Sequence, residues 1–316
     1  MMILKTLFYI LVFPGFLFVS SVGLLLAGID RKVLARMQKR VGPPIVQPLY
    51  DFFKLMGKET IIPQAANKTA FLAAPVVGFV SLVVLMLFIP VFSFSAFPAK
   101  ADLIVVLYLL TIPGVALIVG GSASGSPYAG IGISREMVTM MAYELPLIMV
   151  LLAVAKKVGG DALCFSLQDI VAWQAANGSA LCHWSLLPAA LAMLLVIPAE
   201  VGTQPFDVAE AETEICEGPL IEYSGAPLAM FKLNTALKMF VMTALFTALF
   251  LGGIDTGVVA LNAVILVAIC IVLTLLCMTT IHAVTARLKV EHLFKFYWTT
   301  VAGLAALSLI LVWLGL

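Results

Sequence analysis

The sequence predicts an all-α polytopic membrane protein with about eight transmembrane helices, built as a single integral membrane domain over residues 1–316. Hydrophobic residues make up 63% of the chain and charged residues only 11%, whereas a soluble domain carries about 25% charge. Eight apolar runs are long enough to cross a hydrocarbon layer of about 30 Å at about 1.5 Å per residue. Such a chain could not cover itself with polar surface in water, so membrane lipid is its expected surrounding. The formal net charge of +1 gives no indication of a nucleic-acid partner.

The expected helices follow the apolar runs along the chain. The first run begins after Lys5, is too long for a signal-peptide core and lacks a clear small-residue cleavage site, so we interpret it as a retained helix. Prolines interrupt several runs, which membrane helices tolerate when neighbouring groups satisfy the freed carbonyls. The predicted spans are residues 6–28, 69–97, 102–121, 136–155, 185–201, 228–252, 256–283 and 296–316.

The distribution of lysine and arginine predicts the orientation. Most of the 18 basic residues fall in loops that an eight-helix arrangement places on one side of the membrane. Positive residues are enriched in cytoplasmic loops, so we expect these loops in the cytoplasm and both termini outside. The predicted cytoplasmic loops are residues 29–68, 122–135, 202–227 and 284–295.

The third of these loops predicts a short acidic amphipathic helix between the fifth and sixth spans. Thr203 can cap it, Pro205 suits its first turn, and Gly218 ends it. Four carboxylates would share one face at spacings of three, four and three residues, and Glu212 would point elsewhere. Like charges on one stripe raise some carboxylate pKa values towards neutrality, as proton transfer requires. The alternative is a solvated loop helix. The four residues are Asp207, Glu210, Glu214 and Glu217.

Two ionisable residues are expected at membrane depth. Glu144 lies ten residues after Ser134, a plausible helix cap, which corresponds to about 15 Å, and intramembrane acids usually mark ion pathways. Lys238 lies within the sixth span and is the obvious cationic partner for one of the acids. Both could instead be structural, as a neutral acid and an inert ion pair. Four residues near membrane boundaries could either cap and snorkel or take part in function: Glu136, Glu200, Glu222 and Arg135.

The first loop carries an amphipathic segment from Arg40 to Glu59, which includes a rigid Gly-Pro-Pro turn. Apolar residues share one helical face, and Asp51, Lys54 and Lys58 supply the polar one. This pattern is typical of a helix lying on the membrane surface or of a docking surface for a soluble partner, and the two are compatible. The five cysteines form no C-x-x-C pair and the three histidines have no ligand spacing, so we expect neither a metal site nor a catalytic centre in this chain.

Three segments together resemble the family of the complex I H subunit, which is also called subunit 1. They are Arg40–Glu59, SREMVTMMAYELP from Ser134 to Pro146, and PFDVAEAETEICEGPLIEYSG from Pro205 to Gly225; Arg287–Trp298 is a weaker match. Only six residues separate Arg40 from Gln47, fewer than in quinone-reducing members. The Gly-Pro-Pro turn, GSPYAGIGISRE at Gly125–Glu136 and CEGPLIEYSG at Cys216–Gly225 resemble the membrane-anchor subunits of group 4 nickel–iron hydrogenases, such as Ech-type hydrogenase and formate hydrogenlyase.

The resemblance implies a prokaryotic inner-membrane protein without its own redox cofactor. Its expected partners are a hydrogenase large and a small subunit, a ferredoxin-like iron–sulfur subunit and antiporter-like membrane subunits, with the nickel–iron centre and iron–sulfur clusters in those partners. The implied role is coupling electron transfer to proton or sodium translocation. The acids that match family positions are Glu144, Asp207, Glu210, Glu212, Glu214 and Glu222. The basic residues expected at the partner interface include Arg40, Arg135 and Arg287.

Three alternatives stay open at this point. The chain could be the quinone-chamber H subunit of an NADH:quinone oxidoreductase, although the short first loop disfavours quinone binding. A stand-alone ion transporter would predict paired broken helices or repeat halves, which the sequence does not display. A scaffold with inert acids would tolerate their replacement by glutamine.

Overall fold

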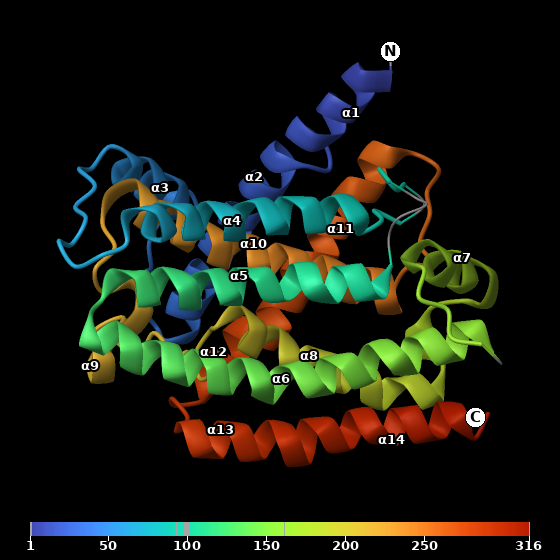
Figure 1. The fold of residues 1–316 in the computed structure, drawn as a ribbon. Helices are drawn as coiled ribbons and strands as arrows, with labels where there is room; N and C mark the ends of the chain where they lie inside the picture. The colour runs from blue at the N-terminus through green and yellow to red at the C-terminus, as the bar shows by residue number, and fades with distance from the viewer. Residues whose placement is uncertain (1, 93, 98–101, 161, 316) are drawn as a thin grey trace.

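The computed structural model describes residues 2–92, 94–97, 102–160 and 162–315 and forms a bundle of long helices (Figure 1). Within these residues, eight helical segments are long and apolar enough to cross a membrane, which confirms the predicted all-α membrane architecture. The spans are α1 (Met2–Leu11) with α2 (Phe16–Met37), α4 (Lys68–Phe88), α5 (Leu103–Ser124), α6 (Pro127–Gly159), α8 (Leu187–Val201), α10 (Gly225–Phe250), α11 (Val259–Thr274) with α12 (Thr280–Val284), and α13 (Val290–Phe296) with α14 (Ala302–Trp313).

Shorter elements connect the spans. Three of them are α-helices: α3 (Gln47–Met56), α7 (Leu167–Asn177) and α9 (Glu212–Ile215). Short 3₁₀ turns cover Ala180–Cys182, Trp184–Leu186 and Gly218–Leu220. Two π-helical segments, η5 (Leu275–Thr279) and η6 (Tyr297–Val301), interrupt the last two spans.

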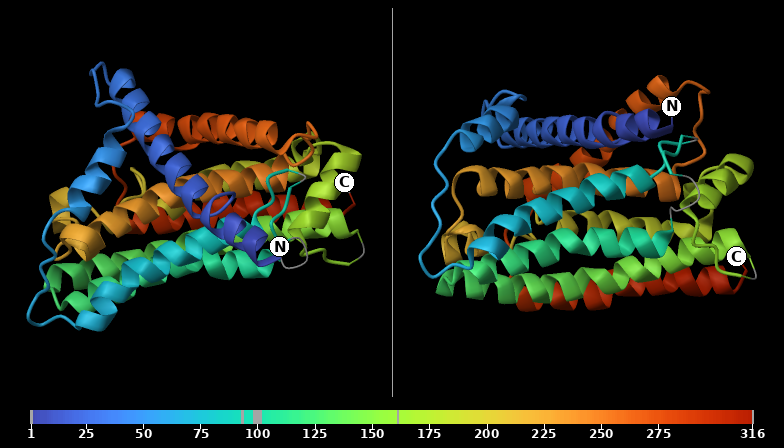
Figure 2. Two further views of the ribbon diagram at one scale, coloured as in Figure 1. Left: turned by 90° about the horizontal axis from the view of Figure 1, so that it is seen from above. Right: turned by 45° about the horizontal axis from the view of Figure 1, so that its top comes forward.

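The connecting segments gather at two ends of the bundle. One end, named the α3 end, holds α3, α9, the junction of α5 with α6 and the connection from α12 to α13 (Figures 1 and 2). Both termini and α7 lie at the opposite end, named the α7 end. The four loops predicted to share one side of the membrane therefore lie at one end of the bundle. Which end faces the cytoplasm stays a prediction.

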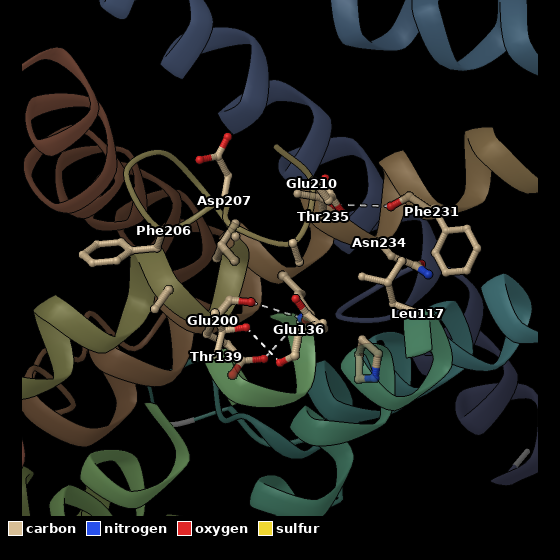
Figure 3. A pocket seen from close by; sticks show the side chains of 16 residues that line it. Leu117, Glu136, Thr139, Glu200, Phe206, Asp207, Glu210, Phe231, Asn234 and Thr235 are labelled. Carbon is tan, nitrogen blue, oxygen red and sulfur yellow. Dashed lines mark hydrogen bonds and ion pairs between the residues drawn. The ribbon is translucent and has the colours of Figure 1, made fainter. Parts of the chain in front are cut away.

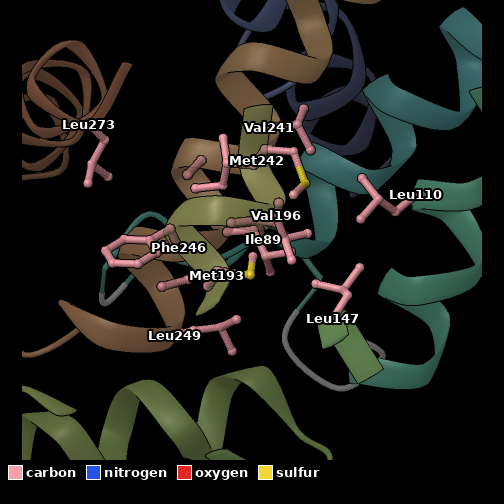
Figure 4. Close-up of a cluster of buried hydrophobic side chains, with 14 of the residues drawn as sticks. Ile89, Leu110, Leu147, Met193, Val196, Val241, Met242, Phe246, Leu249 and Leu273 are labelled. Atoms are coloured by element: carbon pink, nitrogen blue, oxygen red, sulfur yellow. The ribbon is translucent and has the colours of Figure 1, made fainter. Parts of the chain in front are cut away.

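Helix α10 is the centre of the bundle. Almost all of its residues from Leu233 to Phe250 are buried, and it packs against α2, α4 and α8. Side chains from α10 meet Leu110 of α5, Leu147 of α6 and Met193 of α8 in one apolar core (Figure 4). The outer faces of the spans remain apolar, as Leu72, Val76 and Val80 on α4 illustrate. Their four-residue spacing places them on one helical stripe, which a hydrocarbon layer would cover.

Neighbouring groups satisfy the backbone where proline interrupts α4. Pro75 has no N–H, so the carbonyl of Phe71 loses its partner within the helix. The Tyr223 hydroxyl donates to that carbonyl at 3.1 Å, and the rings of Tyr223 and Phe71 stack with centroids 4.0 Å apart. The Asn234 amide donates to the carbonyl of Pro75 at 3.0 Å. Because buried carbonyls must be paired, these hydrogen bonds fix the segment after α9 and the start of α10 against α4.

Three helix boundaries differ clearly from the sequence prediction, the first being that α4 ends at Phe88 and not at residue 97. Helix α6 begins at Pro127, with Ser126 at its N-cap, so the predicted loop 122–135 contracts to a tight turn in which Gly125 adopts φ 71°. Glycine permits this left-handed turn, and Ser134 lies inside the helix. The first span is broken at residues 12–15, and α2 then continues to Met37, well beyond the predicted end at residue 28.

The acidic helix predicted over residues 205–217 is present only as the four-residue helix α9, so its predicted extent is wrong. Residues 203–211 run as turns and extended backbone, and only Glu212–Ile215 are helical. Phe206, Val208 and Ala211 are buried, so the segment folds inward as a loop. A helix would have aligned four like charges, which repel one another. In the loop, the carboxylates separate and find different partners.

Candidate functional site

Lys238 and Glu200 form a buried ion pair in the centre of the bundle. The Lys238 ammonium lies 3.3 Å from a Glu200 carboxylate oxygen and donates to the Glu200 carbonyl at 3.1 Å. Glu200 is the penultimate residue of α8, where the helix leaves its carbonyls without internal partners and its dipole favours a cation. Lys238 therefore neutralises both the side chain and the helix end. The sequence analysis expected Lys238 to pair with Glu144 or a loop acid, whereas its partner in the structure is Glu200.

A small cavity of about 50 Å³ adjoins this ion pair, and further carboxyl groups line it (Figure 3). Glu136 enters from α6 and Glu210 from the loop after α8, while Lys238 comes from α10. A water needs about 10–15 Å³ of such volume, so the cavity has room for a few waters. The cavity thus gives ionisable groups from three separate chain segments one shared space, large enough for water to connect them.

Glu210 and Asp207 are carboxyls of this cavity that lie in the loop outside the membrane-spanning helices. Burial raises the pKa of Glu210 to about 7, and the nearby charges of Glu136, Glu217 and Asp207 add to the increase, while Lys238 opposes it. In the described part of the chain, Glu210 has no ion-pair partner. A carboxyl that titrates near neutrality can gain and lose a proton under physiological conditions.

Two other loop acids are held by arginines. The Arg287 guanidinium donates to Asp207 through Nε at 3.0 Å and through Nη2 at 2.7 Å. Arg135 of α6 donates to Glu214 at 2.6 Å and to the Val208 carbonyl at 3.3 Å. The sequence prediction assigns the acids to coupling and the arginines to partner docking. In the structure they anchor the acidic loop to α6 and to the segment before α13.

Two further predicted acids, Glu144 and Glu222, lie apart from the small cavity. Glu144 is near the middle of α6 and half-buried, beside the exposed Met141. Glu222 is half-buried at the start of the segment that leads into α10. The backbone of Glu212 opens α9, and its side chain lies outside the described part of the structure. The structure thus brings Glu136, Glu200, Glu210 and Lys238 together and leaves Glu144 and Glu222 outside the group.

A second, open cavity of about 460 Å³ lies at the α3 end between α2, α3 and α10. Helix α3 packs against α2 and α10, so its amphipathic segment forms a wall of this cavity, and Tyr50 and Phe53 remain exposed on its other side. Asp51 accepts from Arg31 at 3.3 Å. Arg40 is exposed and donates to the Gln38 side chain. The charged residues of this cavity include Asp51, Lys54, Lys58, Glu210 and Glu217.

Sequence reasoning missed two residues of these sites. Asp30 lines the second cavity, but the predicted helix ends before it, which makes it an ordinary loop residue in the prediction. The sequence signal that could have identified Asp30 is its position directly before the basic residues Arg31 and Lys32 at the end of an apolar run. Tyr143 is buried in α6 and hydrogen-bonds the Glu200 carboxylate. It gave no signal, because a tyrosine among apolar helix residues resembles ordinary core.

The described residues contain no group of three or more His, Cys, Asp or Glu side chains arranged to hold a metal ion. All five cysteines are free thiols, and Cys270 and Cys277 are buried among apolar helices. These donors therefore do not fit a nickel–iron centre or an iron–sulfur cluster, and we derive no redox step within this chain.

A sequence profile of the NADH dehydrogenase family matches residues 8–313. The chain belongs to this family. It is 38% identical over 229 residues to hydrogenase-4 component C of Escherichia coli K12, covering 72% of this chain and 70% of that relative. It is also 38% identical over 237 residues to the H subunit of the NADH-quinone oxidoreductase of Rhodospirillum rubrum, covering 71% and 67%.

Longer and structural matches agree with this assignment. The H subunit of the NADH-quinone oxidoreductase of Thermomicrobium roseum is 34% identical over 303 residues, covering 89% of this chain and 87% of that relative. A chain of the membrane-bound sulfane sulfur reductase, an archaeal respiratory membrane complex, superposes with a TM-score of 0.87 at 32% identity, covering 98% and 99% of the two chains. This family member is thus a multi-pass membrane subunit of a complex I-like or group 4 hydrogenase-like respiratory complex.

Proposed function

We propose that this chain is the membrane-anchor subunit of an energy-converting nickel–iron hydrogenase that couples electron transfer in docked subunits to proton or sodium translocation. The observation that carries the proposal is the group of Glu210, Glu136, Glu200 and Lys238 around one small buried cavity. The short connection between Arg40 and Gln47 and the likeness to hydrogenase-4 component C support the hydrogenase branch.

In the proposed mechanism, a redox event in a partner at the α3 end changes the charge near Glu210. Because the pKa of Glu210 is about 7, a small electrostatic change suffices to move its proton. Two unit charges about 5 Å apart interact by about 3 kcal/mol at an effective dielectric constant of 20, which corresponds to about two pKa units. The changed charge then acts on Glu136 and on the Glu200–Lys238 pair beside the same cavity.

The proposed complex also contains a hydrogenase large and a small subunit, a ferredoxin-like subunit and antiporter-like membrane subunits. The nickel–iron centre and the iron–sulfur clusters belong to these partners in this proposal. Glu144, half-buried near the middle of α6, would pass the change towards a neighbouring membrane subunit. The α3 end would face the cytoplasm.

The test replaces Glu210 and Glu144 by glutamine in the whole complex, reconstituted into vesicles. Hydrogen turnover and ion uptake are measured together, with E291Q as a matched control because Glu291 is exposed at the start of α13. We expect E210Q and E144Q to reduce ions moved per hydrogen while turnover and assembly persist. Full coupling in both variants would remove the mechanism and leave an inert scaffold.

The open cavity of about 460 Å³ favours a second candidate function. Its volume lies within the range of about 300–1,000 Å³ that is usual for small-molecule sites, and several relatives are H subunits of NADH-quinone oxidoreductases. In this alternative, the chain forms the quinone chamber of such an enzyme. Quinone reduction by the purified complex, blocked by quinone-site inhibitors, would support it, whereas hydrogen-dependent activity insensitive to those inhibitors would support the hydrogenase.

A further inference from the structure

Asp30 is a carboxyl of the open cavity that the proposed mechanism does not use. It lies in α2, seven residues before the helix ends, and is half-buried on the cavity wall. One of its oxygens accepts a hydrogen bond of 2.6 Å from the Thr279 hydroxyl. Glu210 and Glu217 line the same cavity. Asp30 and Glu210 therefore share one open space, although they come from chain segments far apart in sequence.

The partner of Asp30 is positioned by an irregular helix. Thr279 is fully buried and ends the π-helix η5, which packs against α2 and α8. A π-turn adds a residue to the helical register and so rotates the following side chains by about 100° relative to a regular helix. Such turns are rare and frequently occur at functional sites. Here the turn interrupts the long apolar span that contains α11 and α12 and directs a hydroxyl at an acid.

The basic residue next to Asp30 in the sequence pairs with a different acid. Arg31, its neighbour in sequence, lies 3.3 Å from Asp51. His282 is three residues beyond Thr279, on the same helical face. Unlike Glu200, Asp207 and Glu214, Asp30 is therefore held in the described structure by a neutral donor. The other charged groups that line the cavity are Lys54, Lys58, Glu210, Glu217 and Lys232.

We infer that Asp30 is a second proton-exchanging carboxyl of the coupling site, with Thr279 as its positioning residue. This inference rests on the proposed function and adds a second carboxyl from which protons can reach Glu210. The proton leaves the Asp30 carboxyl, crosses cavity water to the Glu210 carboxylate, and is replaced from solvent. No electron is exchanged. The cavity volume of about 460 Å³ holds many waters, so the transfer requires no direct contact between the two acids.

The test uses the intact complex in vesicles and measures protons taken up per electron together with redox turnover. The variants are D30N, T279V and T279S, with E210Q as the reference and D169N as the matched control, since Asp169 is exposed on α7 at the far end. We expect D30N to lower the rate of coupled proton uptake at least tenfold, a modest loss for removing a proton-transfer group, while redox turnover persists. T279V should shift the pH midpoint of coupling, whereas T279S, which keeps the hydroxyl, should not.

The outcomes separate the two proposals. If E210Q loses coupling while D30N keeps it, Asp30 is structural and this inference fails, but the proposed function stands. If both variants keep full coupling, the proposed function fails as well. Should D30N fail to assemble, T279V and T279S decide, since both retain Asp30: a shifted midpoint in T279V alone supports the inference, and identical profiles overturn it.

Discussion

Removing the Lys238 ammonium while leaving Glu200 in place should destabilise the bundle strongly. The two groups are 3.3 Å apart, with side chains only 10% and 3% exposed. At an effective dielectric constant of 20, the attraction at that distance is about 5 kcal/mol. Leaving one partner of a buried pair uncompensated typically costs about 3–5 kcal/mol, whereas replacing both partners by neutral groups is close to neutral. We therefore expect K238M to lower the free energy of unfolding by about 3–5 kcal/mol, and E200Q/K238M to recover most of the loss.

Thermal unfolding in detergent can be followed through the cysteines. Cys270 and Cys277 are buried, so a thiol-reactive fluorophore labels them only after the helices separate, once the accessible Cys164, Cys182 and Cys216 have been blocked. K238M should unfold roughly 5–10 °C below the unaltered chain. K232M is the matched control, because Lys232 is an exposed lysine of the same helix. A double variant no more stable than K238M would refute the reasoning, since the loss would then come from packing and not from an unpaired charge.

Three further predictions follow from the loop and its contacts. Coupling in the unaltered complex should change with a midpoint near pH 7, because the raised pKa leaves Glu210 protonated below about 7 and ionised above it; E210Q should lose that transition, and an unchanged midpoint would exclude Glu210 as its origin. R287K cannot reproduce the two-pronged contact to Asp207, so amide exchange over residues 203–211 should quicken, and unchanged protection would show that the pair does not hold the loop. Y223F leaves the Phe71 carbonyl unpaired, which costs about 1–3 kcal/mol while preserving the ring stack; an unaltered unfolding temperature would contradict this account.

The sequence predicted the spans well because each span is encoded locally. A run of about 20 apolar residues needs no tertiary information to be identified as a membrane helix. The same local reasoning failed for residues 205–217, where spacing alone suggested a helix. The deciding facts were distant: Arg287 and Arg135 pair with Asp207 and Glu214, and such partners cannot be read from periodicity.

The candidate site was predicted in composition but not in arrangement. Lys238 and the acids were recognisable because ionisable residues in apolar runs are rare. Their grouping depends on how α6, α8 and α10 cross, so the sequence could not distinguish Glu136 and Glu200, which meet Lys238 around one cavity, from Glu222, which does not. Asp30 was missed because the prediction ended its helix at residue 28, before Asp30. Its hydrogen-bond partner, Thr279, lies in another span and could not be foreseen from local sequence.

The two ends of α10 differ in a way that constrains any ion path. From Met239 to Phe250 the helix has no ionisable side chain, and its last carbonyls are closed by other segments: the Gln174 amide donates to Ala248 and Leu249 at 2.9 and 3.1 Å, and Ser179 donates to Phe250 at 2.6 Å. A proton that reaches Lys238 therefore meets no acid or base of α10 on the way to the α7 end. Among the acids predicted to take part in coupling, Glu144 lies near the middle of α6 and is partly exposed. A proton path that leaves the chain sideways through α6 therefore fits the charge distribution better than a path that follows α10 across the membrane. Such a sideways path fits the proposed coupling role, in which the ion would cross the membrane in a neighbouring subunit, better than it fits a stand-alone channel.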